Sequence, residues 1–133
     1  MESAMTEIPI RGYHLDFYQH VNNARYLEFL EESRWNYFSE TINSEYFETR
    51  GWGFVIVNIN INFRMPAVLG DIVQIECTIK KIGSRSITIY QKITEKNSGK
   101  FVGDADVTFV VLDIKENKAV KINEDLKQMF EKA

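Results

Sequence analysis

The sequence has little of several features that mark special classes of protein. Its 133 residues contain one cysteine, Cys77, and only two prolines, Pro9 and Pro66. A single cysteine excludes an internal disulfide and a zinc site built on cysteines. No apolar run approaches the length of a membrane span, and residues 1–3 do not begin a signal peptide. We therefore expect a cytoplasmic protein with no membrane partner.

An excess of positive charge is also absent. Sixteen Lys and Arg residues stand against 19 Asp and Glu, which gives a net charge of −3. This balance argues against binding to nucleic acid, whose phosphates dominate affinity. What the chain does have is 44% hydrophobic and 13% aromatic residues, with no linker or low-complexity stretch. We expect one domain over residues 1–133, with enough aromatic surface for an interface or an acyl pocket.

A long helix is predicted from the residue pattern after residues 22–23, two asparagines that suit a helix start. Apolar side chains from Tyr26 to Phe38 recur at helical spacing over about four turns. Phe29 and Trp35 widen this stripe, so the helix should be covered on most sides. The segment from Asn123 onward resembles the start of a capped surface helix.

Period-two alternation predicts the strands. Residues 7–15 read as a short first strand, with Pro9 at an edge or a strand start. Four further segments alternate apolar and polar residues, namely 57–63, 73–79, 87–93 and 105–111. The links at 83–85 and 96–100 have hairpin length, so we expect antiparallel strands in meander order. The predicted fold is α+β, a curved antiparallel sheet of about five strands wrapped around the long helix.

Residues 14–26 carry the candidate chemistry, because they lie where strand gives way to helix. The first N–H groups of a helix lack internal partners and can hold a developing oxyanion. Asp16, seven residues before Asn23, would place a carboxylate beside them, as acyl-transfer hydrolysis requires. Spacing alone favours a plainer interpretation, in which Asp16 caps a turn and His20, Asn22 and Asn23 merely begin the helix.

This segment resembles the signature of hot-dog fold acyl thioesterases of the 4-hydroxybenzoyl-CoA thioesterase type, D-x-D-x-x-G-H-V-N-N-x-x-Y. Asp16 matches the second aspartate, and residues 20–23 and Tyr26 match as they stand. The segment is also similar to acyl-carrier-protein thioesterases of the plant type, which share the fold. Residues 62–71 resemble the strand and bend that follow in the family, and the order of elements agrees from about residue 7 to residue 113.

The resemblance implies roles for the matching residues. Asp16 would be the catalytic carboxylate, as nucleophile or general base, and the N–H at or near Asn23 would polarise the thioester carbonyl. His20 and Asn22 would orient the loop and a water or the substrate.

The sequence departs from the family signature at two positions, and from the carrier-protein enzymes at a third. His14 replaces the first aspartate of the signature and Gln19 replaces its glycine. Tyr18 stands where the carrier-protein enzymes have an asparagine implicated in catalysis, so their full residue set does not transfer.

The expected substrate contacts lie in two regions. Near the signature they are Tyr18, Gln19, Tyr26 and Arg64; in the hairpin they are Ser84, Arg85 and Ser86. In the resembled family this hairpin often meets the phosphates of CoA, and a guanidinium between serines suits that contact. The alternative is a hairpin that is charged only for solubility. Phe17, Trp52 and Phe54 are further candidates to line an acyl tunnel.

Three further features of the sequence suggest other assignments. His14 and Asp16 would share a strand face, and together with His20 they suggest a metal only weakly, because no third strong ligand is evident beside that pair. We expect neither a metal nor a cofactor, since CoA is part of the substrate. Glu31 is expected to be structural rather than catalytic. Cys77, on the inward face of a strand, is expected to be a core residue.

The sequence thus predicts a thioesterase that hydrolyses acyl-CoA to a free acid and CoA. We expect a homodimer or a dimer of dimers, paired edge to edge, with residues 52–54 and Arg64 approaching the helix start of the partner. The alternatives are an acyl-carrier-protein thioesterase and a non-catalytic acyl-CoA-binding protein of the same fold.

Overall fold

The computed structural model describes residues 5–39 and 41–132. Residues 1–3, to which the signal-peptide expectation refers, lie outside the described residues. The elements, in chain order, are β1 (Met5–Pro9), η1 (Gly12–His14), α1 (Asn23–Phe38), α2 (Ser44–Arg50), β2 (Trp52–Phe63), β3 (Ile72–Ile82), β4 (Ile87–Glu95), β5 (Phe101–Asp113), β6 (Lys118–Ala119) and α3 (Glu124–Glu131).

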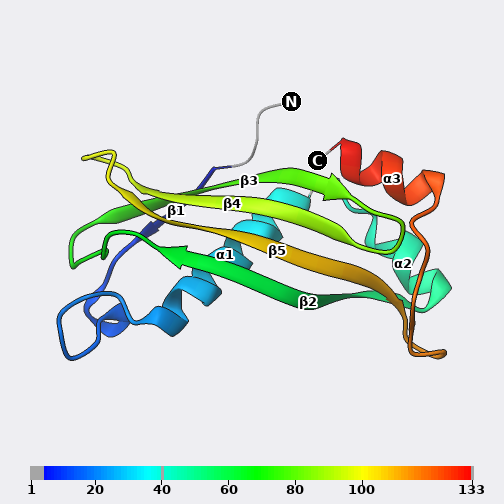
Figure 1. Ribbon diagram of the computed structural model, residues 1–133, viewed down its shortest axis with the longest axis horizontal. Helices are drawn as coiled ribbons and strands as arrows, with labels where there is room; N and C mark the ends of the chain where they lie inside the picture. The colour runs from blue at the N-terminus through cyan, green and yellow to red at the C-terminus, as the bar shows by residue number, and fades with distance from the viewer. Residues whose placement is uncertain (1–4, 40, 133) are drawn as a thin grey trace.

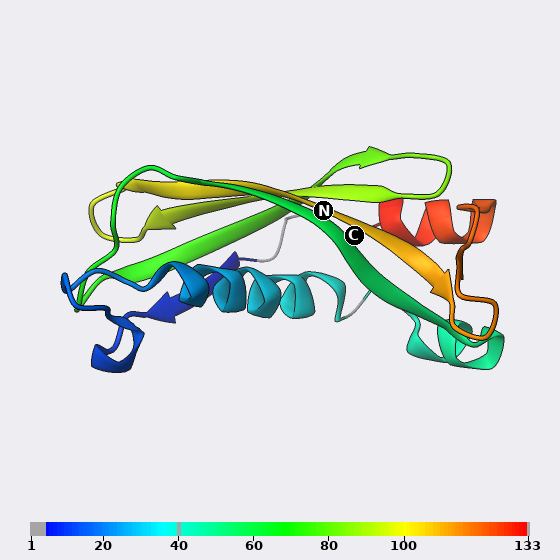
Figure 2. The same ribbon diagram turned by 60° about the horizontal axis from the view of Figure 1, so that its bottom comes forward.

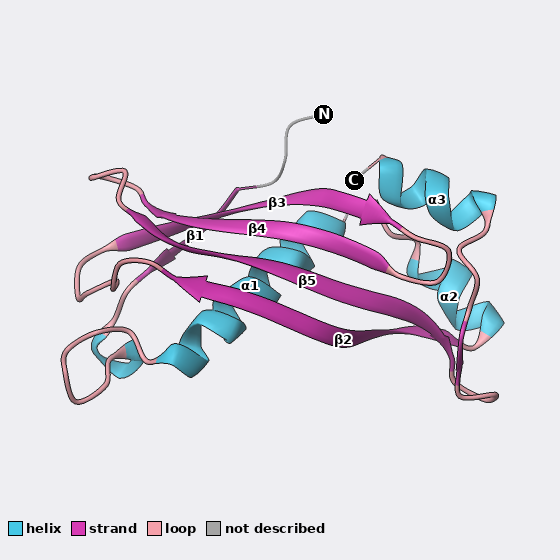
Figure 3. Cartoon of the chain, in the orientation of Figure 1, coloured by secondary structure: helices cyan, strands magenta, loops and turns pink. Residues whose placement is uncertain are grey.

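The strands form one curved antiparallel sheet in the order β1-β3-β4-β5-β2, with the short β6 paired to β5 (Figures 1 and 3). The long helix α1 lies beneath this sheet, and α2 and α3 lie together at one end (Figure 2). The buried faces of β3, β4 and β5 are the alternating positions that the sequence predicts, such as Val73, Ile89 and Val107. The α+β fold with a sheet curled around a central helix is therefore confirmed.

The predicted meander order is wrong for β2. This strand pairs with β5, not with β3, so it forms one edge of the sheet while β1 forms the other. The chain from β2 to β3 must cross about 14 Å, three strand spacings, and residues 64–71 are long enough to do so. The expected first strand at 7–15 is also too long. It ends at Pro9, and a 3-10 turn at Gly12–His14 follows.

A bulge interrupts β2 near its middle. Ile56 pairs with Phe109 and Asn58 with Thr108, which leaves Val57 without a partner on β5. The alternation of apolar residues therefore changes phase at Val57, and Ile56 shares the concave face with Ile59. The sequence predicted an unbroken alternation over residues 57–63. That prediction is wrong for Val57, the bulged residue.

The two flanking helices depart from expectation. Asn123 caps α3 as expected, its Oδ1 accepting from the Leu126 N–H at 2.8 Å, yet Leu126 and Phe130 are fully buried. The helix α2 was not foreseen. It is capped by Asn43 and ends at Gly51, which has a left-handed φ of 68°. Among the described residues, no helix combines the length and apolar character needed to cross a membrane.

One side of α1 stays open in the single chain. Trp35 is 69% exposed and Leu27 is 42% exposed, and both lie toward the edge strand β2. The concave face of β2 is likewise uncovered at Phe54, Ile56 and Ile59. The expectation of a helix covered on most sides is therefore not met within one copy of the chain.

Candidate active site

The chain between η1 and α1 folds into a closed loop. Leu15 pairs with Val21 across it, and the Asn22 N–H donates to the His14 carbonyl at 2.8 Å. At the tip, Gln19 has a φ of 64°, in the left-handed region. Glycine adopts this conformation without steric cost, which gives a physical reason for the glycine of the family signature. Gln19 therefore holds, at some steric cost, a backbone conformation that glycine adopts freely.

Asp16 is partly buried in this loop. Its Oδ1 accepts from the Tyr18 N–H at 2.9 Å and from the His20 N–H at 3.4 Å. Within the described part of the chain, its Oδ2 has no hydrogen-bond partner. One oxygen thus caps the turn, as the plainer interpretation held, while the other is available for chemistry.

The start of α1 offers a donor next to this loop. The side chain of Asn22 accepts from the Ala24 N–H at 2.9 Å, and its carbonyl accepts from the Arg25 N–H at 2.9 Å. The Asn23 N–H finds no acceptor among the described residues. Asn22 is therefore the N-cap, and the Asn23 N–H lies at the positive end of a 16-residue helix.

The remaining signature residues take different positions. Tyr18, Gln19 and His20 are exposed. Tyr26 is buried, and its hydroxyl accepts from the Ala67 N–H at 3.1 Å; burial raises the pKa of this phenol. The Ala67 carbonyl in turn accepts from the Val21 N–H at 3.0 Å. Tyr26 thus ties the chain between β2 and β3 to the start of α1.

His14 does not share a strand face with Asp16, contrary to expectation. It closes the 3-10 turn, where its Nδ1 accepts from the Arg11 N–H at 2.9 Å and its ring meets Phe29 edge-on. Burial lowers the pKa of its imidazole. Over residues 5–39 and 41–132, no three His, Cys, Asp or Glu side chains gather as metal ligands.

The predicted CoA contacts lie far from Asp16 in the same chain. Ser84, Arg85 and Ser86 form the turn between β3 and β4, at the end opposite the 15–22 loop (Figure 1). The 11-residue β3 that separates the two ends spans about 36 Å. Arg64 lies at the Asp16 end, half-exposed, with a nitrogen 3.9 Å from Asp104.

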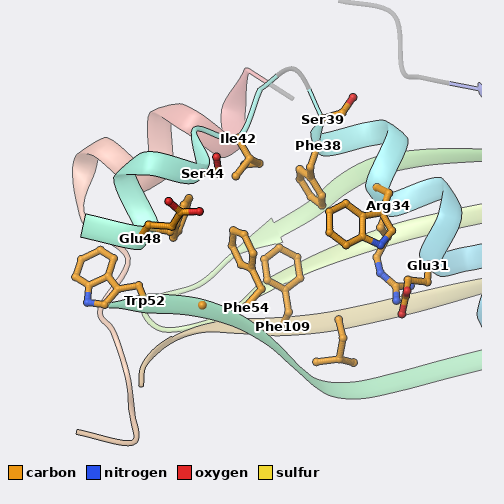
Figure 4. A pocket seen from close by; sticks show the side chains of 14 residues that line it. Glu31, Arg34, Phe38, Ser39, Ile42, Ser44, Glu48, Trp52, Phe54 and Phe109 are labelled. Carbon is orange, nitrogen blue, oxygen red and sulfur yellow. The ribbon is translucent and has the colours of Figure 1, made fainter. Parts of the chain in front are cut away.

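A cavity of about 590 Å³ lies between α1, α2, β2 and β5 (Figure 4). Aromatic side chains dominate its wall, namely Trp35, Phe38, Phe47, Trp52, Phe54 and Phe109. Trp52 and Phe54 thus line a pocket as expected, whereas Phe17 and Tyr18 are exposed at the far end of the molecule. Sequence reasoning missed this pocket because α2, which forms one wall, was missed.

A second hollow of about 540 Å³ continues the first toward the start of α1. The two share Glu31, Arg34, Trp35 and Ile56, and the second reaches Leu27 on the first turns of the helix. Together they form a groove along α1 and β2, which we call the α1–β2 groove.

The family model of the thioesterase-like superfamily matches residues 10–130. The chain belongs to the thioesterase-like superfamily. The long-chain acyl-CoA thioesterase FadM of Escherichia coli (strain K12) is 45% identical over 126 residues, 95% of this chain and 96% of FadM. The crystal structure of YbaW, a probable thioesterase from Escherichia coli, matches with a TM-score of 0.89 at 45% identity and covers 96% of each chain.

A more distant solved structure shares the fold. Slr0204, a 1,4-dihydroxy-2-naphthoyl-CoA thioesterase from Synechocystis, matches with a TM-score of 0.82 at 16% identity, over 95% of this chain and 93% of its own. The predicted family of hot-dog thioesterases is therefore confirmed. The roles of single residues, the cytoplasmic location and the absence of a cofactor stay predictions.

Proposed function

We propose that the protein hydrolyses acyl-CoA thioesters to a free carboxylic acid and CoA. The observation that carries this proposal is that one loop–helix junction holds two groups with no hydrogen-bond partner among the described residues, the Asp16 Oδ2 and the Asn23 N–H. Membership of the superfamily and 45% identity to an acyl-CoA thioesterase support a thioester as the substrate.

In this proposal the thioester oxygen accepts a hydrogen bond from the Asn23 N–H, where the dipole of α1 stabilises the negative charge of the tetrahedral intermediate. The Asp16 Oδ2 either attacks the carbonyl carbon, forming an anhydride that water then cleaves, or takes a proton from an attacking water. In both routes the C–S bond breaks and CoA leaves as the thiol. Only water is consumed, so no cofactor is needed. His20 and Asn22 act by holding Asp16 and the helix start in place.

The α1–β2 groove suits the acyl chain. It starts near Leu27, one turn beyond Asn23, and ends among the aromatic side chains around Phe38. Along the helix axis, Asn23 to Phe38 is about 22 Å, which favours a long chain over a short one. The name of FadM, a long-chain acyl-CoA thioesterase, agrees with this assignment.

The open groove and the free edge of β2 favour a two-fold dimer in which β2 pairs with its copy. Antiparallel pairing about a two-fold axis sets the Trp52 end of one β2 beside the Phe63 end of the other. Phe63 contacts Tyr26 near the helix start, with ring centroids 5.5 Å apart. Each Asp16 would then face the opposite end of the partner, which carries the cavity and the Arg85 hairpin.

The Arg85 hairpin is the proposed contact for the CoA phosphates. Within the described chain, the side chain of Arg85 has no hydrogen-bond or ion-pair partner, whereas Lys80 is already paired with Asp106 at 2.6 Å. Among the described residues, Arg85 and Lys81 are therefore both free cations of this hairpin, and Arg85 is the one in the turn itself. In the dimer it serves the active site that contains Asp16 of the other subunit.

Release of free CoA from acyl-CoAs of increasing chain length tests the function. We expect turnover that favours long chains, and a fall in kcat of at least about 100-fold in Asp16→Asn, with an unchanged fold. Asp125→Asn, on the exposed first turn of α3, is the matched control and should behave as wild type. Faster release from the same acyl chain on an acyl-carrier protein would favour the carrier-protein alternative, and no release from either would favour a non-catalytic binding protein.

A further inference from the structure

Gln91 is a polar residue at a core position of β4. Its side chain is fully buried, with Nε2 donating to the Leu30 carbonyl at 2.9 Å and to the Cys77 Sγ at 3.1 Å. Its Oε1 accepts from an Arg34 guanidinium nitrogen at 3.1 Å. A fully bonded buried amide has one orientation, so Gln91 fixes the position of the Arg34 guanidinium.

Arg34 is a half-buried cation in a largely apolar groove. A guanidinium carries five N–H donors, and in the described chain Arg34 uses one of them, toward Gln91. Burial lowers the pKa of Arg34, and the nearby Glu31 carboxylate opposes that shift. Both side chains line both hollows of the α1–β2 groove. Figure 4 shows them next to each other at the α1 end of the first hollow. Covering this groove with apolar surface alone would leave the free donors unpaired, which is unfavourable.

Glu31 and Arg34 lie at the level where we expect the two-fold axis of the proposed dimer. Ile56 lies next to the bulge at the centre of β2 and lines both hollows together with Glu31 and Arg34. Pairing of two β2 strands about their centre forms the most hydrogen bonds, so the two-fold axis should pass at this level. The two copies of α1 then run antiparallel on either side of the axis. Glu31, just before the level of the axis on one helix, therefore faces Arg34, just after that level, on the other helix.

We propose that Arg34 of each subunit pairs with Glu31 of the partner subunit across the two-fold axis. This inference rests on the dimer proposed above. The two symmetric ion pairs supply acceptors for the free guanidinium donors at the level where the two hollows share their lining. Glu31 and Arg34 are positioning residues in this account, not catalytic ones.

Charge reversal tests the pair through partner choice. Glu31→Arg has only cations at the axis and Arg34→Glu has only anions, so each variant should lose self-association by at least about tenfold. Mixed together, the two variants restore both opposite-charge contacts and should form a heterodimer close to wild type in affinity. Sedimentation velocity on each variant and on the mixture measures this, and circular dichroism checks that each variant is folded. Glu116→Arg, an exposed residue of the β5–β6 turn, is the control for added charge.

The outcomes separate this pair from the dimer itself. Variants that self-associate as wild type does would overturn the pair and leave the dimer standing. Folded variants that do not self-associate and also do not associate with each other when mixed would overturn the pair as well. The loss of affinity would then not depend on charge pairing. A wild-type chain that is monomeric in the same measurement would overturn the dimer, and the pair with it.

Discussion

At the scale of single residues, the loop before α1 shows how far a signature match reaches. Asp16 was found because its type and spacing match a family pattern, and its free Oδ2 is a matter of local hydrogen bonding that spacing does not specify. Tyr26 matches the same signature, yet its hydroxyl is buried and bonded to the Ala67 N–H. The sequence match therefore identified Tyr26 as a residue of the signature, but it did not show whether Tyr26 contacts substrate or stabilises the fold.

Tyr26→Phe separates those two roles. Removing the hydroxyl leaves the buried Ala67 N–H without its acceptor, so the free energy of unfolding should fall by about 1–3 kcal/mol. The KM for acyl-CoA should change by less than about twofold, because the side chain does not face the groove. Urea unfolding and initial-rate kinetics measure the two effects. A raised KM at unchanged stability would instead assign Tyr26 to the substrate.

At the scale of elements, the spacing of apolar residues predicted the strands that have one buried face, but not which strands pair with each other. The strands β3, β4 and β5 alternate cleanly because α1 and α3 cover one face of each. The neighbour of β2 was not predictable, since residues 64–71 fit a hairpin link or a crossover equally well. The helix α2 was missed because its seven residues are too short to show a helical period, although its caps, Asn43 and Gly51, were visible.

The β4–β5 turn carries a pH-dependent contact. The carboxylate of Glu95 accepts from the N–H groups of Ile72, Ser98 and Asn97, with Ile72 the largest contribution, and these bonds lower its pKa to about 2 from an ordinary value of 4.5. The ionised form is thus favoured in the folded state. Its stabilising effect is complete above pH 4.5 and is lost as the pH falls toward 2.

Glu95→Gln should therefore be less stable than wild type at pH 6–7, and the difference should shrink as the pH falls from about 5 to 2. Thermal unfolding at several pH values measures it, with the exposed Glu116→Gln as the matched control, for which we expect no such trend. A difference that stays constant over this range would show that Glu95 acts through packing and not through its charge.

At the scale of the whole molecule, a single chain leaves its functional surfaces incomplete. The concave face of β2 and the open side of α1 are exposed, and the Arg85 hairpin and Asp16 lie at opposite ends of the sheet, whose strand β3 is about 36 Å long. The proposed pairing of two β2 edges would account for both facts, because it would cover the α1–β2 groove and bring opposite ends of the two subunits together. The central claim of this account is an active site shared between two copies of the chain.

Mixed dimers of Asp16→Asn and Arg85→Ala test that claim most directly. Asp16→Asn alone should lack turnover, and Arg85→Ala alone should show a raised KM for acyl-CoA but normal use of a short acyl-pantetheine, which lacks the CoA phosphates. If each site takes Asp16 from one subunit and Arg85 from the other, the mixed dimer contains one intact site and one site with both defects. The account predicts about half of the wild-type kcat per dimer, at the wild-type KM. A mixed dimer that keeps the raised KM of Arg85→Ala would contradict it, because both groups would then serve the same site from one chain.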